Sequence, residues 1–290
     1  WRDIGDAARG YLSAAIHACE ALRDEPGQPR DLAELRSAFQ AVVAPAALPR
    51  LCRSVGWTDV GGPMHTLFNH LFFYDLHVAS AILRTAVPHK DALLSGMAAL
   101  ADLEALCSLA CFGWEQPTVC YARFTAAPQV RIERGRHPCV DPRRCVPNSV
   151  QLDPAPRVWL ITGSNMSGKS TFLRMIGVNV LLSQMGAPAC AEALTMCPLR
   201  LMTDLRVRDN LAQNESYFLA EVRHLRRMVL PPQGEAPLLG LIDEPFRGTN
   251  SDEQGAATLA VVEHLKRSPH LFVIATHERK VTELADGRCS

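Results

Sequence analysis

ITGSNMSGKSTFLR, residues 161–174, contains the spacing G-x-x-x-x-G-K-S, which is typical of loops that bind phosphate groups. The apolar run 157–163 predicts a buried strand before this loop, and residues 170–184 follow a helical pattern after it. Gly163 and Gly168 permit backbone angles that point successive N–H groups at phosphate oxygens, and the N-terminus of the helix adds a positive dipole. The segment therefore predicts a nucleotide-binding loop between a strand and a helix.

Two side chains of this loop have expected roles of their own. Lys169 is expected to span the β- and γ-phosphates of a nucleotide, and the Ser170 hydroxyl to bind Mg²⁺. The backbone and short side chains around them complete the phosphate site. The residues of this loop expected to bind the nucleotide are Gly163, Ser164, Asn165, Met166, Ser167, Gly168, Lys169, Ser170 and Thr171.

Acidic and imidazole side chains end two further apolar runs. Asp243 and Glu244 end the run 237–244, and His277 ends the run 270–277. The carboxyl ends of parallel strands form the ligand-binding edge of an α/β sheet. We therefore expect Asp243 to join the Mg²⁺ shell, Glu244 to orient and deprotonate an attacking water, and His277 to sense the γ-phosphate. The alternative for His277 is a solvated residue at a strand end.

The composition limits the class of protein. The chain has 290 residues, enough for about two domains, and its 48% hydrophobic and 21% charged residues are typical of globular proteins. The formal net charge is zero, so overall charge gives no argument for a nucleic-acid partner. The ten cysteines lack the framework of a small secreted domain, and we interpret them as reduced thiols of a cytoplasmic protein. A metal site near His137, Cys139 and Cys145 is less favoured than core packing.

Residues 1–116 are expected to form an all-α region. Asp31 is expected to cap a helix on which Leu35 and Phe39 follow at helical spacing. Two further apolar stripes consist of Leu67, Leu71, Tyr74, Val78 and Ile82, and of Leu93, Met97, Leu100, Leu103 and Cys107. These patterns predict helices packed on helices. No stretch approaches the roughly 20 apolar residues of a membrane span, so none is expected.

Residues 117–290 change to an alternating pattern. Compact apolar runs at 157–163, 237–244 and 270–277 predict buried parallel strands, and helical patterns are found near 170–184, 217–228 and 255–267. Strands that alternate with helices predict an α/β domain, with a mostly parallel central sheet flanked by helices.

Several motifs together carry a family resemblance. TGSNMSGKSTFLR (162–174), DEPFRGTNSDE (243–253) and ATHE (275–278) resemble the ATPase domain of the MutS family, a branch of the ABC-type ATPases. DNLAQNESYFLAEVRHLR (209–226) is similar to the signature segment of that family. LFFYDLHVASAILR (71–84) resembles part of the helical core that precedes the ATPase domain, especially in short MutS-like proteins without the mismatch-recognition domain.

This resemblance implies a fold and a mechanism. A P-loop ATPase domain of the ABC type would follow a helical core or lever region, and ATP with Mg²⁺ would be bound between the two subunits of a homodimer. Ser216 matches the signature serine that reaches the γ-phosphate across the interface, so the expected catalytic residues are Glu244, His277 and Ser216. ATP would close the dimer and hydrolysis would reopen it, and the helical region would carry that motion outward.

The sequence departs from the family pattern at several positions. Asn214 stands where the signature usually has glycine. Cys145 occupies the adenine-stacking position, next to Val146 and Asn148 as the expected nucleotide contacts, so the aromatic platform is missing. Too few residues precede the helical core for a mismatch-reading domain. The C-terminal dimerisation helices of the family are also expected to be absent.

Two functions from different classes follow from these observations. The first is an ATPase of the DNA mismatch-repair type that drives a DNA-associated clamp; DNA enters by resemblance alone. The second is a nucleotide-gated switch or scaffold with a membrane or protein partner, because some short relatives carry a membrane tether upstream. The Arg-rich run 223–228 is more simply the solvated face of a helix than a DNA-binding stripe. A transporter ATPase is weaker because L-S-G-G-Q is absent, and a small GTPase is excluded because N-K-x-D is absent.

Overall fold

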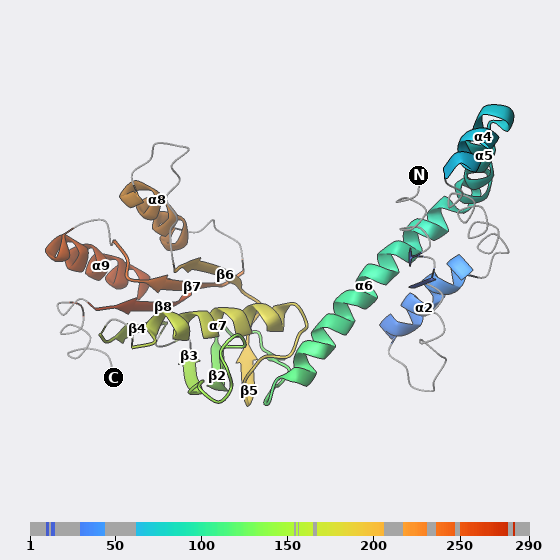
Figure 1. The fold of residues 1–290 in the computed structure, drawn as a ribbon. Helices are drawn as coiled ribbons and strands as arrows, with labels where there is room; N and C mark the ends of the chain where they lie inside the picture. Colours follow the sequence, from blue (N-terminus) through green and yellow to red (C-terminus); the bar gives the residue numbers. More distant parts are fainter. Residues whose placement is uncertain are drawn as a thin grey trace. The chain divides into compact units, whose positions relative to one another are not determined.

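The computed structural model contains two compact units, Trp1–Ser108 and Leu109–Ser290. The division falls inside the helix α6 (Lys90–Glu115), whereas the boundary predicted at residues 116 and 117 follows the end of that helix. The residues that the structure describes are 10, 11, 13, 14, 30–43, 62–153, 155, 157–164, 167–205, 217–230, 236–246, 250–277 and 281 (Figure 1).

The first unit is helical in its described residues. Its elements are α2 (Arg30–Val43), α4 (Gly62–Phe72), α5 (Tyr74–Ala86), the short 3-10 helix η2 (Val87–His89) and the greater part of α6. Leu35 and Phe39 of α2 pack against Ala99 of α6, which confirms the predicted helix-on-helix packing for the stripe of α2. In the stripe predicted on α6, Leu100 and Leu103 pack against the same cluster, whereas Met97 and Cys107 are exposed. The helix begins at Arg30, so Asp31 lies inside its first turn and the predicted cap at Asp31 is wrong.

The apolar stripe predicted from Leu67 to Ile82 is divided between two helices. Phe73 takes a left-handed backbone conformation with φ of 49°, which ends α4 and begins α5. This break rotates the side chains before it out of line with those after it. Leu67 and Leu71 are consequently exposed, and Val78 is the buried residue of α5.

One helical stretch contradicts the expectation that the chain has no apolar run of membrane-spanning length. Tyr74–Glu115, which comprises α5, η2 and α6, is long and apolar enough to cross a membrane by length and composition alone. Only 11% of its most suitable 18-residue window is buried. The stretch was missed because its apolar residues are interrupted by polar ones and do not form a continuous run.

The second unit contains the predicted α/β arrangement. Four parallel strands form one sheet in the order β4 (Val158–Thr162), β8 (Leu271–Thr276), β7 (Leu238–Asp243) and β6 (Arg200–Asp204). The helices α7 (Lys169–Gln184), α8 (Tyr217–Val229) and α9 (Ser251–Leu265) alternate with these strands along the chain. Every residue of β7 and β8 is buried, as expected for inner strands covered on both faces. The three predicted strands and three predicted helices are therefore confirmed.

Helices cover both faces of this parallel sheet. Leu239 and Leu241 of β7 belong to the hydrophobic cluster on the α7 side, whereas Leu238 and Ile242 belong to the cluster with α8 and α9. Successive residues of a strand point to opposite faces, so one continuous apolar run serves both clusters. Figure 1 shows α7 on one face and α8 with α9 on the other.

A second sheet, which the sequence patterns did not predict, covers the other side of α7. Its order is β1 (Arg123–Phe124), β5 (Ala193–Met196), β2 (Val130–Gly135) and β3 (Asn148–Leu152), and β2 is antiparallel to both β5 and β3. Val130 and Ile132 of β2 share a hydrophobic cluster with Leu173 and Ile176 of α7. Helix α7 is therefore enclosed between two sheets (Figure 1).

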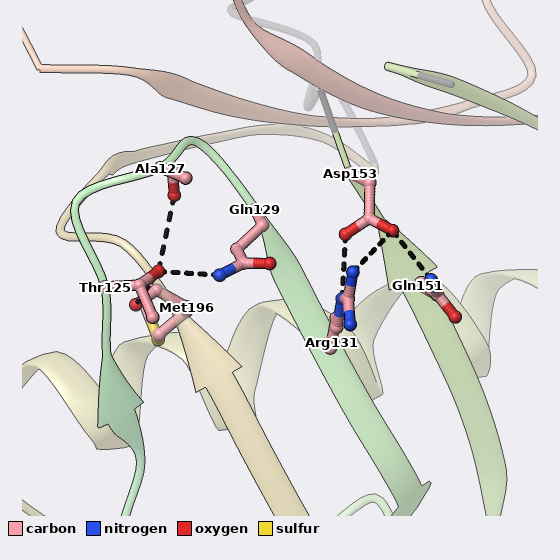
Figure 2. Close-up of polar contacts among 7 residues, drawn as sticks. All are labelled: Thr125, Ala127, Gln129, Arg131, Gln151, Asp153 and Met196. Carbon is pink, nitrogen blue, oxygen red and sulfur yellow. Dashed lines mark hydrogen bonds and ion pairs between the residues drawn. The ribbon is translucent and has the colours of Figure 1, made fainter. Parts of the chain in front are cut away.

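Polar contacts join β2 to the edge strand β3 of the second sheet (Figure 2). Arg131 on β2 donates two hydrogen bonds of 2.8 and 2.9 Å to the carboxylate of Asp153, which follows β3. Gln151 donates a third to the same carboxylate at 2.7 Å. The hydrogen bonds from Arg131 lower the pKa of Asp153 below its ordinary value. These contacts join β2 and β3 at the end away from the loop that connects them.

Gly240 provides a test of how tightly the parallel sheet is packed. It lies in β7 opposite Phe272 of β8, and an added Cβ would meet the Phe272 ring and lie 3.2 Å from Met228 Cε of α8. We expect Gly240→Ala to lower the free energy of unfolding by about 1–3 kcal/mol, because overpacking forces neighbours to move. Urea denaturation measures this change. The control is Gly10→Ala, because a Cβ added at Gly10 meets nothing within 4 Å. Equal free energies of unfolding for the two variants would contradict the prediction.

Candidate nucleotide-binding site

The glycines at the two ends of the loop between β4 and α7 both have positive φ, 156° at Gly163 and 95° at Gly168. Gly168 immediately precedes α7 and has φ of 95°, a left-handed conformation that favours glycine. The N–H of Phe172 donates to the carbonyl of Gly168 at 2.9 Å and closes the first turn of the helix. Ser164, Ser167 and Gly168 are exposed at this end of the parallel sheet. The N-terminus of α7 therefore opens at the carboxyl end of β4.

Lys169 is buried although it carries a charge, and its ammonium group is satisfied by the loop itself. Its side chain is 7% exposed, and Nζ donates to the carbonyl oxygens of Gly163 at 2.7 Å and Ser164 at 2.9 Å. A buried ammonium without partners would be strongly unfavourable. The loop thus places a positive charge beside the N-terminal end of α7. Both this charge and the helix dipole would attract phosphate oxygens bound there.

Ser170 and Asp243 meet although they are far apart in the sequence. Ser170 Oγ donates to Asp243 Oδ2 at 2.6 Å, which joins the first turn of α7 to the last residue of β7. Asp243 is 7% exposed, so its carboxylate faces the protein interior and the loop. A hydroxyl and a carboxylate supply the oxygen ligands that Mg²⁺ prefers, so this pair fits the predicted metal site.

Glu244 and His277 lie next to each other at the ends of adjacent strands. Glu244 Oε1 is 3.3 Å from His277 Nδ1, and the Glu244 side chain is 17% exposed. The backbone N–H of Glu244 donates to the carbonyl of Ala275 at 2.8 Å. Glu244 has φ of 53°, a conformation that is costly for a residue with a side chain. The structure therefore brings Asp243, Glu244 and His277 to the same sheet edge.

The turn after β7 is held by two buried side chains that the sequence analysis missed. Glu221 of α8 is 2% exposed and accepts a hydrogen bond of 2.7 Å from the N–H of Phe246. Gln254 of α9 donates to the carbonyl of Pro245 at 2.9 Å. Phe246, like Glu244, has a positive φ of 63°. Both helices therefore support a strained turn whose first residue is Glu244; polar residues at otherwise apolar helix positions were the sequence signal.

A pocket of about 920 Å³ continues from the phosphate loop toward β3. Its volume lies within the range of about 300–1,000 Å³ that is usual for ligand sites. It is lined by Gly163, Ser164, Ser167, Gly168, Lys169 and Thr171 of the loop, and by Val146 and Asn148, the expected nucleotide contacts. Asn148 Nδ2 donates to the carbonyl of Val146 at 2.9 Å, which fixes this part of the wall.

Aromatic and imidazole groups also line this pocket. Trp159 of β4, Phe172 of α7 and His137 contribute to the wall together with Cys145. Burial, with a smaller contribution from Arg174, lowers the pKa of His137, so the neutral imidazole is favoured. His137 Nδ1 accepts a hydrogen bond from the N–H of Cys139 at 3.2 Å, which leaves the proton on Nε2. An aromatic platform is missing at Cys145, as expected, and Trp159 and Phe172 are aromatic wall residues that were not among the expected nucleotide contacts.

The remaining predictions fall on other parts of the chain. Asn165, Met166 and Ser216 lie outside the described residues. Within the described ranges, no group of three or more His, Cys, Asp or Glu side chains is arranged to hold a metal ion. Burial raises the pKa of Cys190 to about 11, so this thiol stays neutral near pH 7. Core packing, the interpretation preferred near His137, Cys139 and Cys145, is wrong for Cys139, which is exposed, whereas Cys145 is partly buried.

Two comparisons with known proteins bear on this site. Residues 159–288 match the family model described as MutS domain V. The chain is also 32% identical over 216 residues to the DNA mismatch repair protein MSH3 of Chaetomium globosum, a match that covers 71% of this chain and 18% of that protein. The chain thus spans less than a fifth of this relative's length. Both matches support a MutS-family ATPase domain in this chain, and the family model places its match within the second unit.

Glu221 provides a test of the support for the turn after β7. Glu221→Ala leaves the N–H of Phe246 unpaired in a buried place, so we expect a loss of about 1–3 kcal/mol in the free energy of unfolding. Glu221→Gln keeps an acceptor oxygen and should lose less. Urea denaturation measures both changes, with the exposed Arg226→Ala on the same helix as the control. If Glu221→Ala is no less stable than Arg226→Ala, Glu221 does not support the turn.

Proposed function

We propose that this chain binds ATP with Mg²⁺ and hydrolyses it as part of a DNA mismatch-repair protein of the MutS type. The observation that carries the proposal is the meeting of Lys169, Ser170, Asp243, Glu244 and His277 at one edge of the parallel sheet, beside the phosphate loop. The family match of residues 159–288 supports the same chemistry.

Each of these side chains has a distinct task in the proposed reaction. Bound ATP would supply the phosphoanhydride bond, and Mg²⁺ would neutralise charge on its phosphates. Lys169 would exchange its bonds to loop carbonyls for bonds to phosphate oxygens, and Ser170 with Asp243 would hold the cation. Glu244 would orient a water and accept its proton, and the neighbouring His277 would sense the terminal phosphate. The strained backbone at Glu244 presets the direction of its carboxylate.

The proposed enzyme is a dimer with sites shared between its subunits. This part rests on the resemblance of the segment 209–226 to the family's signature and on Ser216 within it. Helix α8 starts directly after Ser216, at Tyr217, and its Glu221 is bonded to the turn that carries Glu244. If Ser216 enters the site of the partner subunit, a movement there would also move α8. Through Glu221, α8 would then move the turn of Glu244 in its own subunit, which links the two sites of the dimer.

DNA is proposed as the partner on the name of the relative, which is a DNA mismatch repair protein. A second function is favoured by one observation, the apolar helical stretch Tyr74–Glu115, which suits a nucleotide-gated switch with a membrane partner. The two functions separate experimentally. Salt-dependent, ATP-sensitive binding to duplex DNA supports the first, and flotation with phosphatidylcholine vesicles without DNA binding supports the second.

Two substitutions test the shared chemistry. We expect Lys169→Ala to weaken ATP binding at least about tenfold, because charge-assisted hydrogen bonds to phosphate are lost. Glu244→Gln should keep ATP binding but lower kcat by about a hundredfold or more, because the amide accepts no proton from water. Calorimetric titration measures binding and phosphate release measures kcat. Hydrolysis by Glu244→Gln at the parent rate would remove Glu244 from the role of base.

Mixed dimers test the shared site. Ser216→Ala and Glu244→Gln homodimers should each be nearly inactive, since every site lacks one group. In a mixed dimer one site combines the intact Ser216 of one subunit with the intact Glu244 of the other, so activity should return to about half the parental rate per mixed dimer. Mass spectrometry confirms that mixed dimers form. Mixed dimers without activity would contradict the sharing of Ser216 between subunits.

A further inference from the structure

Asn179 is a fully buried polar side chain in the middle of α7, and the proposed reaction does not use it. It is 0% exposed and lies about 15 Å along the helix axis from Lys169, at 1.5 Å per residue. Its neighbours on the helix include the buried Ile176 and Val180. An amide placed among such residues costs about 1–3 kcal/mol unless its hydrogen bonds are made. Its partners therefore show what the residue holds together.

The amide of Asn179 closes a ring of hydrogen bonds with two distant backbone segments. Nδ2 donates to the carbonyl of Arg136 at 3.0 Å and to that of Met175 at 2.8 Å. Oδ1 accepts from the N–H of Cys190 at 2.7 Å. The N–H of Arg136 in turn donates to the carbonyl of Cys190 at 2.8 Å. Asn179, Arg136 and Cys190 are thus each bonded to the other two.

This ring lies at the start of the loop 136–147, which forms one wall of the nucleotide pocket. The neck of the loop is closed by pairing of Gly135 with Asn148. A Cβ on Gly135 would lie 2.8 Å from Met175 Sδ, so the backbone here is pressed against α7. The loop residues that line the pocket are His137, Val140, Arg144, Cys145 and Val146. Asn179 is therefore a side chain of α7 that joins this wall to the helix by hydrogen bonds.

We propose that Asn179 is a positioning residue for the nucleoside part of the ligand, an inference that rests on the proposed binding of ATP. Through Arg136 and Cys190 it holds the loop 136–147 at a fixed distance from α7. The phosphate loop at the N-terminal end of α7 keeps its own contacts, Lys169 to Gly163 and Ser170 to Asp243, which do not involve the ring. Loss of the ring's hydrogen bonds makes the loop that contacts the base and ribose more mobile, and it leaves the contacts of the phosphate loop unchanged.

Two ligands distinguish binding at the nucleoside end of the pocket from binding at the phosphate loop. ATP engages both ends, whereas inorganic tripolyphosphate has no base or ribose and engages the phosphate loop alone. With Mg²⁺ present, we expect Asn179→Leu and Asn179→Ala to raise the Kd for ATP about tenfold, as for loss of a buried hydrogen-bonded group. The Kd for tripolyphosphate should change by less than about twofold, within the scatter of distant substitutions. Calorimetric titration measures both constants.

Ser183→Ala is the matched control for these variants. Ser183 is buried one turn further along α7, and its hydroxyl donates to the carbonyl of Asn179 at 2.8 Å, so Ser183→Ala removes a buried hydrogen bond of the helix and leaves the ring of hydrogen bonds intact. Its two Kd values should stay near those of the parent. Equal weakening of ATP and tripolyphosphate by the Asn179 variants would show general damage to α7 and overturn the proposal. Unchanged binding of both ligands would overturn it as well.

Hydrogen exchange of the parent protein gives an answer even where the variants fail to fold. ATP should slow amide exchange in the peptide 136–147, whereas tripolyphosphate should slow it at 163–171 alone. Equal protection of 136–147 by both ligands would overturn the role of this loop in holding the nucleoside. A parent protein that binds tripolyphosphate but not ATP overturns this inference together with ATP as ligand. Binding of neither overturns the proposed function itself.

Discussion

The hydrogen bond from Ser170 to Asp243 joins the two segments on which the candidate site depends. It links the first turn of α7 to the end of β7 at 2.6 Å, across a sheet in which β8 lies between β4 and β7. Parallel pairing brings the carboxyl ends of all three strands to one edge, so residues that end separate apolar runs become neighbours. Without that pairing, the phosphate loop and the acidic residues would remain unrelated parts of the chain.

Helix α7 differs from an ordinary surface helix because both of its sides are covered. Its buried residues face the parallel sheet on one side and the antiparallel strands on the other. A helix that is enclosed in this way shows little amphipathic pattern, and close approach requires small residues at the contacts. Gly177 is one of them, since an added Cβ would lie 3.0 Å from Leu241 Cδ1. The helix therefore connects the phosphate end of the pocket rigidly to the loop 136–147.

The turn after β7 joins the helices on the opposite face of the sheet to the same edge. Glu244 and Phe246 both have positive φ, and such strain persists where surrounding contacts hold it. The contacts come from Glu221 of α8 and Gln254 of α9. The position of Glu244 is thus set by its strand and by two helices. This arrangement connects the carboxylate to α8, the helix that follows the segment resembling the family signature.

The sequence by itself determined the alternating strands and helices, the phosphate loop and the acidic ends of the strands, because these depend on local spacing and on continuous buried runs. It did not determine the second sheet, whose short strands depend on partners far away in the chain, such as β2 with β5. The break at Phe73 was hidden because an apolar stripe does not record backbone angle. Tertiary structure alone decided the roles of Glu221 and Asn179, since a buried polar side chain acquires its meaning only from the distant groups to which it is bonded.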